Sequence, residues 1–129
     1  MNTLGVALVL SLLCLWTVVA EAAEAKKLNP YTGQVDAIQE GKALYDRYGC
    51  ADCHRTERGV GGRGQGLAVL DDEWVFGSDD ETLFKLIRGE LPGQTMPATP
   101  GKDLPEEEIW KMLAYIRSLY QGDPSKITW

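Results

Sequence analysis

The sequence has few cysteines, a single histidine and fewer basic than acidic residues, which limits the kinds of binding site it can form. Its 129 residues include thirteen Lys and Arg against nineteen Asp and Glu, which gives a net charge of -6. An acidic chain of this size is unsuited to binding a phosphate backbone, which argues against nucleic-acid binding. Three cysteines cannot build a scaffold of several disulfides. A single histidine, His54, limits every metal site and every acid–base mechanism to one imidazole.

One long hydrophobic run is present, and it lies at the N-terminus. Leu4–Ala20 carries no charge, and small residues follow around Ala20-Glu21-Ala22. This pattern is typical of a secretory signal peptide with its cleavage site, so we expect residues 1–22 to be a signal. An uncleaved anchor helix stays open, because no Lys or Arg precedes the run. A lipoprotein signal is the other alternative, but Leu13 rather than a small residue precedes Cys14, which we interpret as an apolar member of the signal.

The remaining residues, 23–129, predict one all-α domain with an irregular lead-in over 23–34. Apolar spacing and capping signals predict helices at Val35–Tyr48, from a capping box at Ser78–Glu81 to Gly89, and from Pro105 to Gly122, with a short helical turn in Leu70–Phe76. No segment shows the alternation of a β-strand. Residues 55–70 and 89–104 are long loops, which are uncommon in a compact domain. A large rigid group packed between them would explain both.

The motif Cys50-Ala51-Asp52-Cys53-His54 is the strongest chemical signal. Two thiols at this C-x-x-C-H spacing add to the two vinyl groups of one haem, and the adjacent histidine binds its iron. A zinc site needs about four Cys or His ligands, and the processed chain has three. A thioredoxin-like pair expects a β–α context, and a disulfide between Cys50 and Cys53 gives His54 no role. We therefore predict one covalent haem c, bound through Cys50 and Cys53, with His54 as the proximal iron ligand.

The sixth iron ligand cannot be a second histidine. A thioether is the other familiar choice, and the processed chain has only Met96 and Met112. Met112 lies in the last amphipathic helix, where methionine usually fills a core. Met96 lies in a loop, and Pro97 restricts it to extended backbone. We predict Met96 as the distal ligand; an open or water-bound position and an ordinary loop methionine are the alternatives.

With these motifs the sequence resembles a class I cytochrome c over Val35–Tyr120. The haem motif and Gln94-Thr95-Met96-Pro97 carry most of the resemblance. In the family, a glycine and an aromatic residue four positions later on the first helix pack against the last helix, and Gly41 and Tyr45 match that pattern. The resemblance implies a monohaem fold of three to five helices with long loops around the cofactor.

Two further segments bear on this resemblance. The family often has Gly-Pro-x-Leu after the haem motif, with the proline carbonyl bonded to the proximal histidine. Here the segment reads Gly64-Gln65-Gly66-Leu67, so the Gln65 carbonyl is our first candidate for the partner of His54. Asn29–Gly33 and Asp71–Gly77 resemble small periplasmic cytochromes that accept electrons from quinoprotein alcohol or methanol dehydrogenases. Within the second segment, Trp74 and Phe76 are equally explained as aromatic packing around a haem.

The resemblance implies a periplasmic one-electron carrier rather than an enzyme, passing electrons from a dehydrogenase towards an oxidase. The alternatives are an electron-accepting subunit or anchored cytochrome of another dehydrogenase, and an open-site haem sensor or enzyme. We expect a monomer that meets its redox partners near Ala51, Asp52 and Leu91–Ala98. The acidic runs Asp71–Glu73 and Asp79–Glu81 either face a basic partner or are solvated helix starts.

Overall fold

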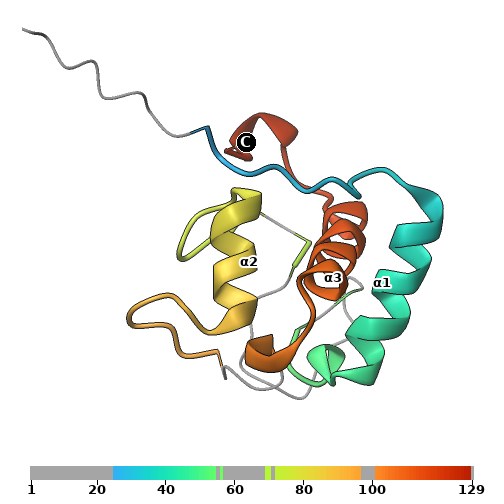
Figure 1. The fold of residues 1–129 in the computed structure, drawn as a ribbon. Helices are drawn as coiled ribbons and strands as arrows, with labels where there is room; N and C mark the ends of the chain where they lie inside the picture. The colour runs from blue at the N-terminus through green and yellow to red at the C-terminus, as the bar shows by residue number, and fades with distance from the viewer. Residues whose placement is uncertain (1–24, 55, 57–68, 71, 97–100, 129) are drawn as a thin grey trace, which may run out of the picture.

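The computed structural model describes residues 25–54, 56, 69–70, 72–96 and 101–128. In this part of the chain there are helices and no strand, as the sequence predicts. The elements are α1 (Val35–Arg47), η1 (Cys50–Asp52), α2 (Asp80–Arg88), η2 (Gly101–Asp103), α3 (Glu106–Leu119) and η3 (Pro124–Lys126), where η marks a short 3-10 helix. Figure 1 shows α3 between α1 and α2. The expected signal at residues 1–22 lies outside the described residues.

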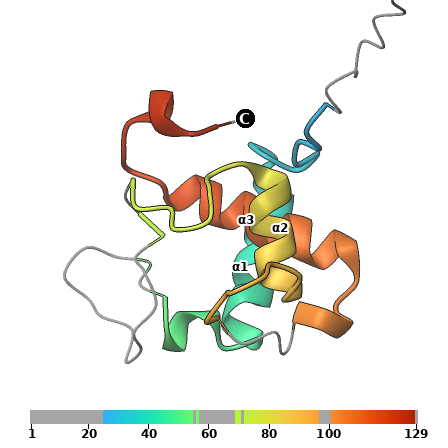
Figure 2. The same ribbon diagram turned by 90° about the vertical axis from the view of Figure 1, so that its left-hand side faces the viewer.

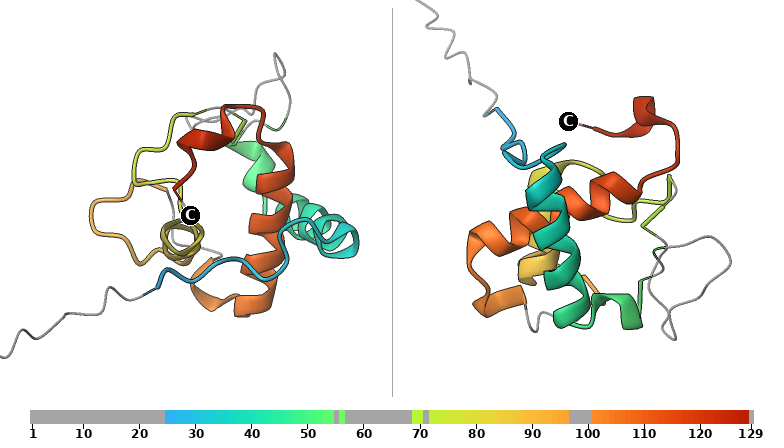
Figure 3. Two further views of the ribbon diagram at one scale, coloured as in Figure 1. Left: turned by 90° about the horizontal axis from the view of Figure 1, so that it is seen from above. Right: turned by 90° about the vertical axis from the view of Figure 1, so that its right-hand side faces the viewer.

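The crossing of α1 and α3 depends on a glycine. A Cβ atom built on Gly41 would overlap the backbone carbonyl oxygen of Lys111, so only glycine allows the two backbones to come this close. One turn later, the rings of Tyr45 and Tyr115 meet edge to face, with centroids 5.4 Å apart. Figure 3 shows the steep crossing that results. The predicted packing of Gly41 and Tyr45 against the last helix is confirmed.

The start of α2 differs by one residue from the predicted capping box. Asp79, not Ser78, is the N-cap, and its Oδ1 accepts a hydrogen bond from the Thr82 amide at 3.0 Å. The Ser78 hydroxyl is engaged elsewhere, because it accepts a hydrogen bond from the Thr128 amide at 2.7 Å. A contact fifty residues away in sequence has therefore moved the cap.

The short helical turn predicted in Leu70–Phe76 is wrong for the described residues of that segment, which form turns and bends. Within this segment, Asp72 holds the C-terminal part of the chain: it accepts hydrogen bonds from the Tyr120 hydroxyl and the Asp123 amide, and pairs with Lys126 at 2.9 Å. Figure 2 shows the C-terminal segment returning beside the loop that precedes α2.

The last helix also ends earlier than predicted. It stops at Leu119 rather than near Gly122, because Tyr120 is extended and the Gln121 amide donates to the Leu70 carbonyl at 2.9 Å. Its start agrees with the prediction, with Pro105 as the N-cap and Glu106, Glu107 and Glu108 in the first turn.

The hydrophobic core lies where α3 meets the other two helices. It consists of Leu44, Leu83, Phe84, Leu104, Ile109, Trp110, Met112 and Leu113. Phe84 and Trp110 stack with centroids 4.4 Å apart. Met112 is 1% exposed, so the prediction that it fills the core is confirmed.

A buried ion pair joins α2 to α3. The guanidinium of Arg117 donates to Asp80 Oδ1 at 2.6 and 2.8 Å, and the two side chains are 4% and 2% exposed. The Asn29 amide donates to the other Asp80 oxygen at 2.8 Å, and the Asn29 side chain donates to the Trp110 carbonyl at 2.9 Å. The lead-in is irregular, as predicted, and these bonds attach it to both helices.

Candidate haem site

The end of α1 positions the first cysteine of the haem motif. Gly49 takes a left-handed conformation, with φ of 72°, which ends the helix and turns the chain into η1. Cys50 is half-buried against the core, and Cys53 is exposed. Burial raises the pKa of the Cys50 thiol, and the nearby Asp46 and Asp52 raise it further. One thiol therefore faces the core while the other lies at the surface.

The backbone of His54 is tied to the same elements. Its amide donates to the Cys50 carbonyl at 2.9 Å, so the motif closes into a single turn. Its carbonyl accepts from the buried Tyr45 hydroxyl at 3.5 Å. The contact between α1 and α3 and the haem motif are thus connected through one tyrosine.

The loop that carries Met96 is braced by the side chain of Gln94. Gln94 Nε2 donates to the carbonyls of Leu86 and Met96, both at 3.0 Å, and its Oε1 accepts from the Leu91 amide at 3.0 Å. Leu86 is in α2 and packs against the core that Cys50 contacts. In the sequence, Gln94 is named only as part of the Gln94–Pro97 motif. Its side-chain amide, two residues before Met96, is the feature that could have indicated a bracing role.

The aromatic residues before α2 separate into two environments. Trp74 packs against the core, with its ring 6.0 Å from that of Tyr120 and the Arg117 guanidinium 5.6 Å above it. Phe76 is 39% exposed and its neighbour Val75 is 72% exposed, so Phe76 does not share the core position of Trp74, and its packing around a haem stays a prediction. The buried Trp74 Nε1 has no hydrogen-bond acceptor in the described part of the chain.

These features fit a haem. Apolar side chains from α2, from α3 and from the loop before α2 pack against the same core as Cys50 but stay partly exposed; they are Trp74, Leu86, Ile87 and Ile116. A large apolar macrocycle would cover such a surface. The orphaned indole N–H fits the carboxylates that a haem carries, because a buried donor without an acceptor is costly.

Three expectations meet different outcomes. Gln65, our candidate acceptor for His54, lies outside the described residues. No group of three or more His, Cys, Asp or Glu side chains placed to bind a metal ion occurs in the described part of the chain. Among the described helices, none is long and apolar enough to cross a membrane.

Comparison with known proteins agrees with a haem site of the cytochrome c type. The family described as cytochrome c oxidase, cbb3-type, subunit III, matches residues 36–116. The chain is 32% identical over 103 residues to the cbb3-type cytochrome c oxidase subunit FixP of Sinorhizobium medicae (strain WSM419), which covers 73% of this chain and 34% of FixP.

A solved structure is also similar. Cytochrome cL from the marine methylotrophic bacterium Methylophaga aminisulfidivorans matches with a TM-score of 0.61 and 29% identity, over 77% of this chain and 63% of its own. The chain thus spans about a third of FixP and somewhat less than two thirds of cytochrome cL. The class I cytochrome c fold predicted from the sequence is confirmed by this likeness. The chain belongs to the c-type cytochromes of the cytochrome c oxidase, cbb3-type, subunit III family, which carry covalently bound haem c.

Proposed function

We propose that the protein is a periplasmic one-electron carrier with a single haem c. Cys50 and Cys53 form the thioethers, His54 is the proximal iron ligand and Met96 the distal one. A haem iron held by both residues would exchange electrons without binding oxygen or substrate. The main support for this proposal is the bracing of the Met96 loop by Gln94. The Gln94 side chain holds the loop backbone to α2 through hydrogen bonds to two carbonyl groups, and these bonds do not use the Met96 thioether.

Several residues support the carrier around the iron. Cys50 would attach one side of the cofactor to the core, and Cys53 would hold the other side at the surface, where electrons could be exchanged. Trp74 Nε1, which has no acceptor in the described part of the chain, would donate a hydrogen bond to a haem carboxylate. The apolar side chains on the core exclude water, and a buried haem with a methionine ligand has a raised reduction potential.

We further propose that the electron donor is a quinoprotein alcohol or methanol dehydrogenase and that the electrons pass towards a terminal oxidase. The similar cytochrome cL of a methylotrophic bacterium supports this choice. Residues 1–22 would then be a cleaved signal peptide that directs the chain to the periplasm. We expect N-terminal sequencing of the purified protein to begin after residue 22.

A second candidate is an electron-accepting subunit of a larger complex, which the similarity to FixP favours. The two functions differ in how the protein is isolated. A carrier is purified alone and reacts with added dehydrogenase, whereas a subunit remains with an oxidase or a dehydrogenase through purification.

The covalent bonds are tested by removing the thiols. The denatured protein keeps its haem colour through acid extraction and gel electrophoresis if both thioethers are present. Cys50→Ala and Cys53→Ala each weaken attachment, and the double variant releases the haem. Haem that leaves the unmodified chain under these conditions would refute the proposal.

The distal ligand is tested with the two methionines. Oxidised protein shows the weak long-wavelength band of methionine sulfur on ferric haem; Met96→Ala removes it, lowers the potential and lets cyanide bind. Met112→Ala keeps the band, but its cavity lowers the free energy of unfolding by about 2–5 kcal/mol. If Met112→Ala removes the band instead, the ligand assignment is wrong.

A further inference from the structure

The acidic runs considered in the sequence are mostly occupied within the fold. Asp79 caps α2, and Asp80 is buried against Arg117. Asp72 is held by Tyr120 and Lys126. These three carboxylates therefore have partners within the fold, and Asp80 is buried rather than solvated. A charged site for a partner has to be sought elsewhere.

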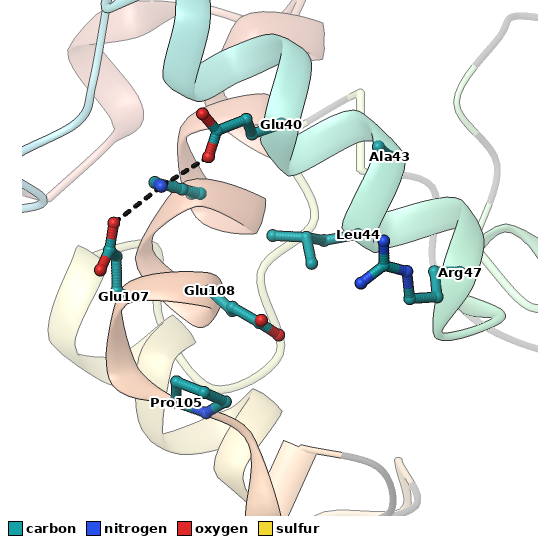
Figure 4. Close-up of a pocket in the computed structure, with 8 residues that line it drawn as sticks. Glu40, Ala43, Leu44, Arg47, Pro105, Glu107 and Glu108 are labelled. Atoms are coloured by element: carbon teal, nitrogen blue, oxygen red, sulfur yellow. Dashed lines mark hydrogen bonds and ion pairs between the residues drawn. The ribbon is translucent and has the colours of Figure 1, made fainter.

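A cavity with a charged lining lies between α1 and α3, and we call it the α1–α3 groove. It has a volume of about 440 Å³ and is lined by Glu40, Ala43, Leu44, Arg47, Pro105, Glu107, Glu108 and Lys111. Figure 4 shows Glu108 reaching from α3 and Arg47 from α1 towards the same space. Its apolar wall comes from the α1 side chains Ala43 and Leu44 and from Pro105.

The charges of the groove leave an excess of carboxylate. Lys111 Nζ lies 2.5 Å from Glu40 and 2.7 Å from Glu107, so this one cation is shared by two acids (Figure 4). Glu108 accepts from the Tyr48 hydroxyl at 2.8 Å, which raises the pKa of Tyr48, while the Arg47 guanidinium beside the same hydroxyl acts in the opposite direction. Three carboxylates against Arg47 and Lys111 give the lining one net negative charge.

The groove adjoins the haem motif. Arg47 is the last residue of α1, and Tyr48, the partner of Glu108, packs on the core that Cys50 also contacts. The exposed carboxylate of Asp52 adds negative charge beside the Cys50 thiol, whereas that of Asp46 is paired with Lys42 at 2.8 Å. The groove therefore lies next to an acidic residue of the haem motif.

We propose that the α1–α3 groove seats a lysine or arginine side chain from the surface of a redox partner protein. Its hydrocarbon stem lies along Leu44 and Pro105, and its charged head meets Glu108 and Glu107. This rests on the proposed electron-carrier function and identifies the partner's contact surface as basic. Such contacts steer approach and orientation without making the complex long-lived, as a carrier requires.

The test uses the haem-loaded, isotopically labelled protein and pentalysine as the probe, at low ionic strength. We expect pentalysine to shift the amide signals of the second half of α1 and the first turn of α3. Glu108→Gln keeps an acceptor for Tyr48 but removes the charge, and weakens binding about two- to fivefold, in the range of one exposed ion pair. Arg47→Gln strengthens it.

Glu106→Gln is the matched control. Glu106 is exposed in the same helical turn and pairs with Lys27 at 3.5 Å, outside the groove. Its substitution removes an equal charge and leaves pentalysine binding within experimental error. Equal losses for Glu106→Gln and Glu108→Gln, shifts mapped to another surface, absence of binding, or pentaglutamate binding in place of pentalysine would each overturn the proposal.

Failure of the docking inference is separable from failure of the proposed function. Protein that keeps its methionine band and is reduced by hexaammineruthenium(II), but binds pentalysine elsewhere, is an electron carrier with a different docking surface. Protein without the band or the covalent haem refutes the proposed function, wherever the peptide binds.

Discussion

Three consecutive acids at the start of α2 have three different environments, and the structure predicts three different costs for removing them. Asp80 accepts hydrogen bonds from the Asn29 amide and from Arg117, and both members of the ion pair are almost inaccessible to water. Asp80→Asn keeps the shape and leaves the Arg117 charge buried without its carboxylate. Breaking a buried pair in this way costs about 3–5 kcal/mol, a large part of the roughly 5–15 kcal/mol that stabilises a domain.

The neighbouring acids serve as controls. Asp79 caps the helix through the Thr82 amide, so Asp79→Ala lowers the free energy of unfolding by about 1 kcal/mol. Glu81 forms an exposed i,i+4 pair with Lys85 at 2.6 Å, and Glu81→Gln costs at most about 0.5 kcal/mol. The predicted order of stability loss is therefore Asp80, then Asp79, then Glu81.

Guanidinium denaturation of the haem-loaded protein, followed by far-ultraviolet circular dichroism, measures all three. A shift in midpoint with an unchanged slope identifies a loss of stability. Each single substitution leaves the other partner's charge buried and unpaired, whereas the double variant leaves no unpaired charge. Asp80→Asn combined with Arg117→Met therefore lowers the free energy of unfolding by less than the sum of the two single substitutions. A loss for Asp80→Asn no larger than that for Glu81→Gln would refute this reasoning.

Three further predictions follow from particular contacts. Gly41→Ala places a methyl group against the Lys111 carbonyl, and thermal denaturation is expected to show a free energy of unfolding lower by about 1–3 kcal/mol or more. A loss below about 0.5 kcal/mol, typical of a surface substitution, would contradict the close crossing of α1 and α3. Trp74→Phe keeps the ring but removes the indole N–H; if that N–H binds a haem carboxylate, redox titration shows a lower reduction potential, and an unchanged potential contradicts the contact. Burial alone would raise the pKa of Asp79, but hydrogen bonds from Thr82 and the charge of Lys26 lower it. Its stabilising contribution is therefore present above about pH 4 and is lost as the pH falls through the lowered folded-state pKa, so Asp79→Asn flattens the acid limb of the stability curve.

Local signals determined much of the fold. The apolar stripe of Val35–Tyr48 and the Pro105 start of the last helix were correct because helix spacing and capping act within one or two turns. The haem motif was equally readable, since its five residues are consecutive and share one turn. The identification of Met96 as the distal ligand stays a prediction, and the bracing of its loop by Gln94 became visible only in the structure.

Other features were decided by partners far away in the chain. Asp79 rather than Ser78 caps α2, because the Ser78 hydroxyl accepts a hydrogen bond from the Thr128 amide, fifty residues later in the chain. In the sequence, Asp72 and Asp80 resemble solvent-exposed acids. In the structure, the Tyr120 hydroxyl donates a hydrogen bond to Asp72, and Arg117 forms an ion pair with Asp80. Short-range patterns contain no information about which distant group will satisfy a given oxygen. That choice depends on the crossing of α1 with α3 and on the returning C-terminal segment, and it is therefore made only when the chain folds.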